Sequence, residues 1–198
     1  MATYRGIGAV GQTILGLLKD ASADTEFAGQ RFELFQASDF SGPNPIQEGI
    51  SLYLFRVAVN TSRRNMPPGV GPDGQRFKPP IPVDLYYLLT PWAKNAVKQH
   101  RLLGWAIREM QNVPVLPSSL LNFYAPERDT FRPSETVELV FDIMTPQDME
   151  NILNPVKMTQ PLSVCYVVRT VFLESTVPYG EGAPVQTRVF DYGEVVEG

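Results

Sequence analysis

The apolar positions of this chain recur with two different periods, and the longest helical pattern lies in residues 91–111. Apolar side chains recur there every 3.6 residues or so, which predicts the main helix. Its stripe consists of Trp92, Ala96, Leu103, Ala106, Ile107 and Met110. Residues 5–20 show the same period and predict a second helix. The stripe of that helix consists of Ile7, Val10, Gly11, Ile14, Leu17 and Leu18.

Two shorter helices are predicted near the middle and the end of the chain. Thr145, Pro146 and Asp148 supply an N-cap, a first-turn proline and a first-turn acid. These signals predict a helix that begins there and runs to about Leu153. Residues 118–124 predict a short helical turn.

Alternating or continuously apolar segments predict five strands, with a loop over 38–49 between the first two. The strands are residues 31–37, 50–60, 83–89, 135–144 and 162–174. Residues 50–60 and 162–174 are apolar on both faces, which is typical of strands covered on both sides, and the longer one is expected to be central. The strand at 135–144 places Val137, Leu139 and Phe141 on one face.

Residues 61–82 separate two of these strands and contain six prolines and three glycines. Proline lacks the backbone donor that a helix or a ladder strand needs, so this segment is predicted to be a long loop without either. Loops of about 20 residues within a compact domain are usually functional. Residues 177–198 also contain several prolines and glycines, with one alternating piece at 185–196. That piece can pair with a sheet edge of its own domain or of a neighbouring subunit.

The order of these elements predicts an α+β fold with a mixed, mostly antiparallel sheet and helices packed on it. We expect residues 1–176 to form a single domain and residues 177–198 to form an extended C-terminal arm. A length of 198 residues fits one domain, and 43% hydrophobic with 19% charged residues is ordinary globular composition.

The net charge and the rare residue types argue against several classes of function. A net charge of −4 provides no basic excess for binding nucleic acid. One Cys and one His exclude an internal disulfide and argue against a zinc site, so we expect no metal and no cofactor. No apolar run reaches the roughly 18 residues of a membrane span, and the N-terminus lacks the basic region of a signal peptide. Synthesis in a cytoplasm is therefore expected.

Two segments match the G-x-G-x-x-G pattern of phosphate-binding loops, Gly6–Gly11 and Gly69–Gly74. A dinucleotide site requires a strand directly before the glycines and a helix after them. Only five residues precede Gly6, and no predicted helix follows Gly74. We therefore interpret the first segment as small residues that let a helix approach the sheet closely.

Few residues could carry enzyme chemistry, and we expect no catalytic residue. His100 is the single imidazole, and it lies in the main helix at the edge of the apolar stripe, where a core or interface role is favoured. A small hydrolase that uses His100 is the weaker alternative. Cys165 lies in the predicted central strand, where a buried and inert thiol is expected. The sequence has no G-x-S-x-G nucleophile elbow.

Three regions favour contact with other proteins. Trp105 lies opposite the apolar stripe of the main helix among charged residues, which favours a protein contact, although a second layer could instead cover it. Two arginines open the long loop, and the C-terminal arm alternates apolar and polar positions. The predicted interface residues are Arg63, Arg64, Met66, Lys98, Arg101, Trp105, Val185, Val189, Phe190 and Tyr192.

Five sequence blocks occur in the order of one known family. They are EGISLYLFRVAVN (48–60), RRNMPP (63–68), PPIPVDLYYLLTPWA (79–93), QHRLLGWAIREMQ (99–111) and FRPSETVELVF (131–141). Together they resemble the cap or tube-terminator family of extracellular contractile injection systems, typified by Photorhabdus virulence cassettes and the antifeeding prophage. The likeness extends from about residue 3 to 175. It departs at 149–155, MENILNP, where the family pattern is expected to have an aromatic residue after the acid.

The resemblance implies a non-enzymatic homo-oligomeric ring, expected to be a hexamer, at the baseplate-distal end of the inner tube and outer sheath. Such a ring would stop the polymerisation of both, with the inner-tube and sheath proteins as its partners, in an assembled phage-tail-like particle. Longer relatives continue into further C-terminal domains. A generic monomeric binding module and an enzyme or nucleotide-binding protein stay open as other classes.

Overall fold

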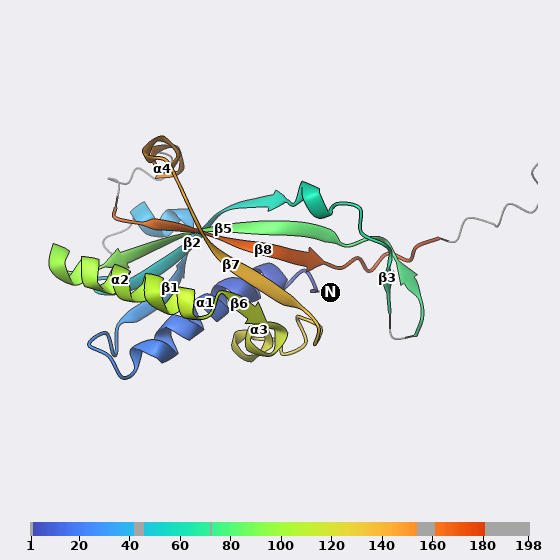
Figure 1. Ribbon diagram of the computed structural model, residues 1–198, viewed down its shortest axis with the longest axis horizontal. Coiled ribbons are helices and arrows are strands. Elements are labelled where there is room, and N and C mark those ends of the chain that lie inside the picture. The colour runs from blue at the N-terminus through green and yellow to red at the C-terminus, as the bar shows by residue number, and fades with distance from the viewer. Residues whose placement is uncertain (1, 42–45, 72, 154–160, 181–198) are drawn as a thin grey trace, which may run out of the picture.

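A computed structural model describes residues 2–41, 46–71, 73–153 and 161–180, which form one elongated α+β domain (Figure 1). Its helices are α1 (Gly6–Ser22), α2 (Ala96–Asn112), α3 (Ser118–Tyr124) and α4 (Pro146–Leu153). Its main strands are β1 (Arg31–Phe35), β2 (Gly49–Val59), β5 (Ile81–Trp92), β6 (Val115–Pro117), β7 (Thr136–Asp142) and β8 (Val164–Leu173). Two short strands, β3 (Gly69–Val70) and β4 (Arg76–Phe77), and two 3-10 turns, η1 (Ala37–Ser41) and η2 (Thr61–Arg63), complete it.

The six main strands form one sheet in the order β1-β2-β5-β8-β7-β6. β1 is parallel to β2, and the other neighbouring pairs are antiparallel. The sheet is therefore mixed and mostly antiparallel, which confirms the predicted fold class. β8 lies between β5 and β7, so the prediction of a central strand near residues 162–174 is also confirmed.

Helices α1, α2 and α3 cover one face of the sheet and enclose the main core (Figure 1). Tyr87 of β5, Ile14 of α1 and Leu102 of α2 are buried there with 1% or less of their surface exposed. A smaller cluster on the opposite face joins η1, α4 and the ends of β1 and β5. It consists of Phe35, Phe40, Ile46, Leu88, Met149 and Leu153.

Helix α1 packs closely because glycines occupy some of its inward positions. A Cβ atom at Gly11 would lie 2.9 Å from Leu34 of β1, and one at Gly16 would lie 2.2 Å from the ring of Tyr124 of α3. Gly6 is the first residue of α1, with no strand directly before it. The interpretation of Gly6–Gly11 as a close-packing segment is confirmed.

The predicted start of the main helix at residue 91 is wrong. Pro91 and Trp92 belong to β5, and Trp92 donates its indole N–H to Ser51 Oγ of the neighbouring strand at 2.8 Å. The helix starts at Ala96 because Asn95 caps it, accepting a bond from the backbone N–H of Lys98 at 2.9 Å. Trp92 is therefore the last residue of a strand, although its spacing from the apolar residues of α2 also fits the helical period.

Two predictions about strand burial are also corrected. β2 is buried only in its first half, since Val57 and Val59 are 46% and 50% exposed. Phe141 of β7 is 44% exposed, although Val137 and Leu139 on the same face are buried. Edge strand β6 was not predicted, because it is only three residues long, follows Pro114, ends in Pro117 and pairs only with β7.

The segment 61–82 is not the structureless loop that its prolines predict. It contains η2, the hairpin β3-β4 and the first two residues of β5, including Pro82. Proline is tolerated in this arrangement because the hairpin ladder uses residues 69–70 and 76–77, which lie between the proline pairs. The alternating segment 185–196 lies outside the described residues.

Candidate assembly surface

One part of the chain extends beyond the helix-covered sheet. We call it the projection and define it as residues 57–71, 73–82 and 174–180, at the right of Figure 1. Its core is the β3-β4 hairpin, whose turn is closed by the Gly71 N–H donating to Gln75 O at 2.8 Å. Gly74 adopts a φ of +80°, which a residue with a side chain rarely adopts. Asp73 Oδ1 accepts from the backbone N–H of Gln75 at 3.1 Å.

The chain that follows β8 pairs with this hairpin. Lys78 donates its backbone N–H to Val177 O at 2.9 Å, and Tyr179 donates to Arg76 O at 2.8 Å. β4 therefore has β3 on one side and residues 177–179 on the other. The start of the predicted arm is thus fastened to the segment that was expected to be a free loop.

A buried polar network anchors the base of the projection. Asn60 donates its side-chain amide to both carboxylate oxygens of Asp84, at 3.2 and 3.0 Å, and Asp84 is only 8% exposed. Thr170 Oγ1 also donates to Asp84, at 3.3 Å. Asn60 Oδ1 accepts from the backbone N–H of Ser62 at 3.1 Å and so caps η2. The network therefore sets the position of the turn that carries Arg63.

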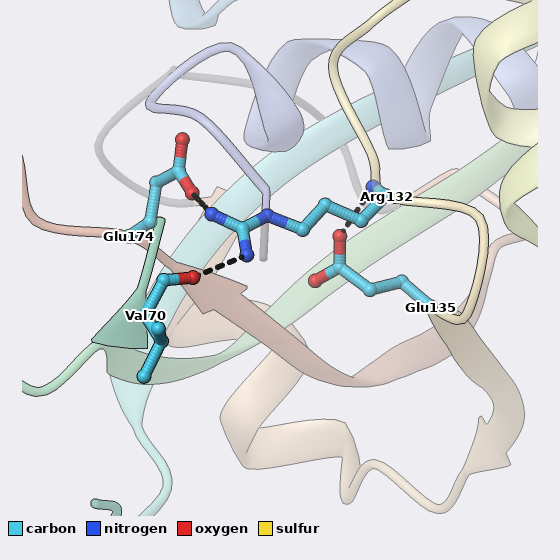
Figure 2. A network of polar contacts seen from close by, with 4 residues as sticks. All are labelled: Val70, Arg132, Glu135 and Glu174. Carbon is cyan, nitrogen blue, oxygen red and sulfur yellow. Dashed lines mark hydrogen bonds and ion pairs between the residues drawn. The ribbon is translucent and has the colours of Figure 1, made fainter. Parts of the chain in front are cut away.

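A second network joins the projection to the loop before β7 (Figure 2). Arg132 donates one guanidinium nitrogen to Glu174 Oε2 at 2.8 Å and another to the backbone oxygen of Val70 at 3.3 Å. Its backbone N–H donates to Glu135 Oε2 at 2.7 Å. A planar guanidinium can hold two such acceptors in fixed directions. Arg132 thus links the hairpin, the end of β8 and the body.

The projection exposes both apolar and basic side chains. Six of the fourteen strongly exposed large apolar residues in the described part of the chain lie on it. They are Val57, Val59, Val70, Ile81, Val177 and Tyr179. Arg63, Arg64, Arg76 and Lys78 are exposed on the same element, whereas Met66 is half-buried. Clusters of exposed apolar groups with basic residues are typical of protein-contact surfaces.

The interface residues predicted on α2 lie elsewhere and form a different surface. Lys98 Nζ lies 2.8 Å from Glu48 Oε2, and Arg101 is paired with Glu26. Trp105 is half-buried rather than exposed, with its ring 5.3 Å from that of Phe27. The alternative of a covering layer therefore describes Trp105 better, and its role in an interface stays a prediction. The structure does not bring these residues together with Arg63 and Arg64. Val185, Val189, Phe190 and Tyr192 lie outside the described residues.

Chemically reactive groups do not converge in the described part of the chain. His100 is exposed on α2, and Cys165 is 2% exposed. Burial, with a smaller effect of Asp142, raises the pKa of the Cys165 thiol to about 12. No group of three His, Cys, Asp or Glu side chains among the described residues has the arrangement of a metal site. Among those residues, no helix is long and apolar enough to cross a membrane.

Sequence reasoning missed Asn60, Asp84, Arg132, Thr170 and Glu174. One of them carried a visible signal, because Asp84 is an acid within the apolar strand VDLYYLL. The others connect positions up to 110 residues apart, which no local pattern links.

Comparison with protein families identifies one family. The model of the Pvc16 N-terminal domain matches residues 9–187. The fold is similar to the sheath/tube terminator of an extracellular contractile injection system, PVC, in its extended state. That match has a TM-score of 0.55 and 15% identity, and it covers 96% of this chain and 62% of that one.

A second similar structure is the tube-terminating cap of the anti-feeding prophage. It has a TM-score of 0.45 and 14% identity, over 77% of this chain and 52% of that chain. The chain therefore spans less than two thirds of either of these proteins. No curated protein sequence matches this chain.

Proposed function

Because this chain belongs to the Pvc16 N-terminal domain family, we propose that it is a structural cap of a contractile injection particle. In this role it forms a ring, which we propose is a hexamer, at the baseplate-distal end. The ring ends polymerisation of the inner tube and of the sheath, and the proteins of both are its partners. The observation that carries the proposal is the family match, which extends over nearly the whole chain.

The physical requirements of a terminator support this role. A terminator must bind the exposed end of the last ring and present no matching surface for another one. This domain has two unlike ends. The projection exposes basic and apolar side chains, whereas at the α2 end Lys98 and Arg101 are already paired with Glu48 and Glu26. A subunit with unlike ends can stop growth in one direction.

The contact devices in this proposal are the projection and the C-terminal arm, residues 177–198. Arg63 and Arg64 contact the tube or a neighbouring subunit, and α2 with Trp105 lies near a subunit interface. The arm adds a strand to a sheet edge of a neighbour, beginning from its pairing with β4. The role needs no catalysis and no cofactor. The chain is made in a bacterial cytoplasm and becomes part of the assembled particle.

Electron microscopy of particles from a producing strain, with and without this chain, tests the role. We expect deletion to give overlong, ragged or unstable tubes and sheaths. Arg63→Ala with Arg64→Ala should give a milder version of the same defect. Arg128→Ala is the matched control, because Arg128 is an exposed arginine outside the projection. Particles of normal length and normal end structure after deletion would contradict the proposal.

The alternative function is that of a generic binding module, and a measurement of the assembled molecular mass distinguishes it from a cap. The binding module predicts a monomer at every concentration, whereas the cap predicts a closed ring in the particle. A hydrolase that uses His100 is disfavoured by the exposed position of His100 on α2. His100→Ala should therefore leave particle length unchanged.

A further inference from the structure

The face of the sheet opposite the main core carries a groove beside α4. It is a cavity of about 430 Å³ between β2 and β5 on one side and the β7-α4 connection on the other. Its lining includes Phe55, Tyr86, Asp142, Ile143, Met144 and Asp148. Ile143 is 90% exposed, more than any other large apolar side chain of the described residues. Together with Phe55, Tyr86 and Met144 it gives the groove a contiguous apolar surface, which is a feature of contact sites.

The charge around this groove is unbalanced. Its lining carries two carboxylates, Asp142 and Asp148, and Glu150 lies on α4 beside them. One cation from another element faces the groove, Arg56, whose guanidinium lies 5.1 Å from the centre of the Tyr86 ring. Asp148 lies in the first turn of α4, where its carboxylate accepts from Thr145 Oγ1 at 2.6 Å and its backbone N–H donates to the same oxygen at 3.2 Å. The groove is therefore apolar at its floor and mainly acidic around it.

The projection has the complementary character. Residues 61–82 contain four Lys or Arg and one Asp, which gives this segment a net charge of +3. The whole chain has a net charge of −4, so the rest of the chain has a net charge of −7. The same segment exposes Val70 and half-exposes Met66 and Phe77. A basic strand hairpin with apolar side chains matches an acidic groove with an exposed isoleucine. Such complementarity steers association and selects the partner.

We propose that the projection of one copy docks in the α4 groove of a second copy. The two surfaces lie far apart on one domain, with α4 at the upper left and β3 at the right of Figure 1, so they do not meet within a chain. Contact between two different surfaces of identical subunits is head-to-tail, and such contacts close into rings when the rotation permits. This inference rests on the proposed ring and names the surfaces that build it.

The chemistry of the contact follows from the groups on each side. The guanidinium groups of Arg63 and Arg64 meet carboxylates such as Asp142, where bidentate, charge-assisted hydrogen bonds form. Apolar side chains of the hairpin cover Ile143. Because exposed charges are screened by ions, association should weaken as salt rises.

Charge reversal tests the contact from both sides. One variant carries Arg63→Glu and Arg64→Glu, and a second carries Asp142→Lys and Asn151→Lys, which leaves the hydrogen bonds between Thr145 and Asp148 intact. We expect each variant alone to lower ring formation at least about tenfold, measured by mass photometry and light scattering, and the combined variant to restore part of it. Lys19→Glu with Arg128→Glu is the matched control, since both basic side chains are exposed outside the two surfaces and outside α2. Circular dichroism verifies that each variant is folded.

Cysteine cross-linking tests the contact in assembled particles. The native Cys165 is 2% exposed, so added thiols dominate the reaction. A chain with both Asn65→Cys and Ile143→Cys should form a ladder of linked subunits under mild oxidation. A mixture of the two single variants should give dimers that contain one of each chain. An absence of mixed dimers, both in solution and in particles, would overturn the proposal.

The outcomes separate this inference from the proposed function. If charge reversal leaves rings and capped particles unchanged, the inference is wrong and the cap role stands. If rings persist while the particles lose their caps, the projection binds the tube or the sheath, and the inference is again wrong. If deletion of the chain leaves particles normal, the cap role itself fails.

Discussion

The body of this domain and its projection share strands β2 and β5, but different interactions hold the two regions. In the body, Leu85 of β5 and Val168 of β8 are fully buried between the sheet and the helices. In the projection, β4 is held by backbone hydrogen bonds to its two neighbours, and Val70 is 53% exposed. The same kind of strand is thus a core element in one region and an exposed one in the other.

Because of this difference, the residues that stabilise the fold are not the residues that are exposed for contact with a partner. Burial of apolar surface contributes about 25 cal/mol per Å², so the body supplies most of the folding free energy. The projection keeps its apolar side chains in water, where they contribute little until a partner covers them. Two polar networks, around Asp84 and around Arg132, hold its position relative to the body. The projection is therefore available for binding without weakening the core.

The largest expected contrast comes from truncating one apolar residue in each region. Leu85→Ala should lower the free energy of unfolding by about 2–5 kcal/mol, because it leaves a cavity in the core. Val70→Ala should change it by less than about 0.5 kcal/mol, because Val70 is exposed. Urea unfolding followed by fluorescence measures both values. Equal losses for the two variants would show that the projection is part of the core.

A smaller effect is expected where the two regions meet. Asp84→Ala removes the acceptor of the Asn60 amide and should lower the free energy of unfolding by about 1–3 kcal/mol. It should also speed hydrogen exchange at the amide of Ser62, because the η2 cap loses its support. Thr170→Val is the control, since it removes one hydroxyl and keeps the carboxylate. If hydrogen exchange at Ser62 is unchanged, the Asp84 network does not hold η2 in position.

The pH dependence of stability should come from the body. Burial, together with the hydrogen bond to Asp20 at 2.6 Å, raises the pKa of Tyr124 from 10 to about 12. Burial likewise raises the pKa of Tyr166 to about 12. The folded state favours the neutral phenols, so their contribution is fully present below about pH 10 and is lost as the pH rises to about 12.

Tyr124→Phe tests this pH dependence. At pH 7 it should cost about 0.5–1.5 kcal/mol, since one hydrogen bond is lost. Its free energy of unfolding should then fall less steeply than that of the wild type between pH 10 and 12. Urea unfolding at a series of pH values measures the two slopes. Parallel slopes would mean that Tyr124 ionises alike in the folded and unfolded chains.

The smallest effect on global stability is expected at the outer network. Arg132→Gln should cost less than about 1 kcal/mol, because the ion pair with Glu174 is exposed. Hydrogen exchange in the hairpin should nevertheless become faster, since the hairpin loses its side-chain link to the body. Arg128→Gln is the control for the loss of one positive charge. If hairpin exchange stays slow, the backbone pairing of β4 alone holds the projection.

The sequence predicted the elements whose signals are local. The stripe of α1 and the Thr145 cap of α4 were found because each lies within a few turns of chain, and Asp148 N–H donates to Thr145 Oγ1 at 3.2 Å as expected. The start of α2 was placed too early because the apolar Pro91-Trp92 pair continues both a strand and a helix pattern. The hairpin in 61–82 was missed because proline content hides two-residue strands.

The candidate surfaces were predicted only in part. Arg63 and Arg64 were singled out as interface residues, since adjacent charges in a Pro/Gly segment are visible in any single sequence. Both are exposed, and their role in an interface stays a prediction. The α4 groove was not predicted, because it joins Phe55 of β2 with Ile143 across strands that are distant in sequence. For Trp105 the sequence left open whether a second layer covers it, because a helical wheel does not show that the Phe27 ring lies 5.3 Å away.

The sequence by itself determined the fold class, the helix that approaches the sheet through its glycines, the central strand and the family. These follow from local periodicity, small residues and blocks of adjacent positions. Only the tertiary structure decided which apolar residues are left exposed, how Asp84 and Arg132 anchor the projection, and that basic and acidic surfaces lie at different ends of the domain. These features depend on which distant segments the sheet brings together, because burial and charge pairing act through space rather than along the chain.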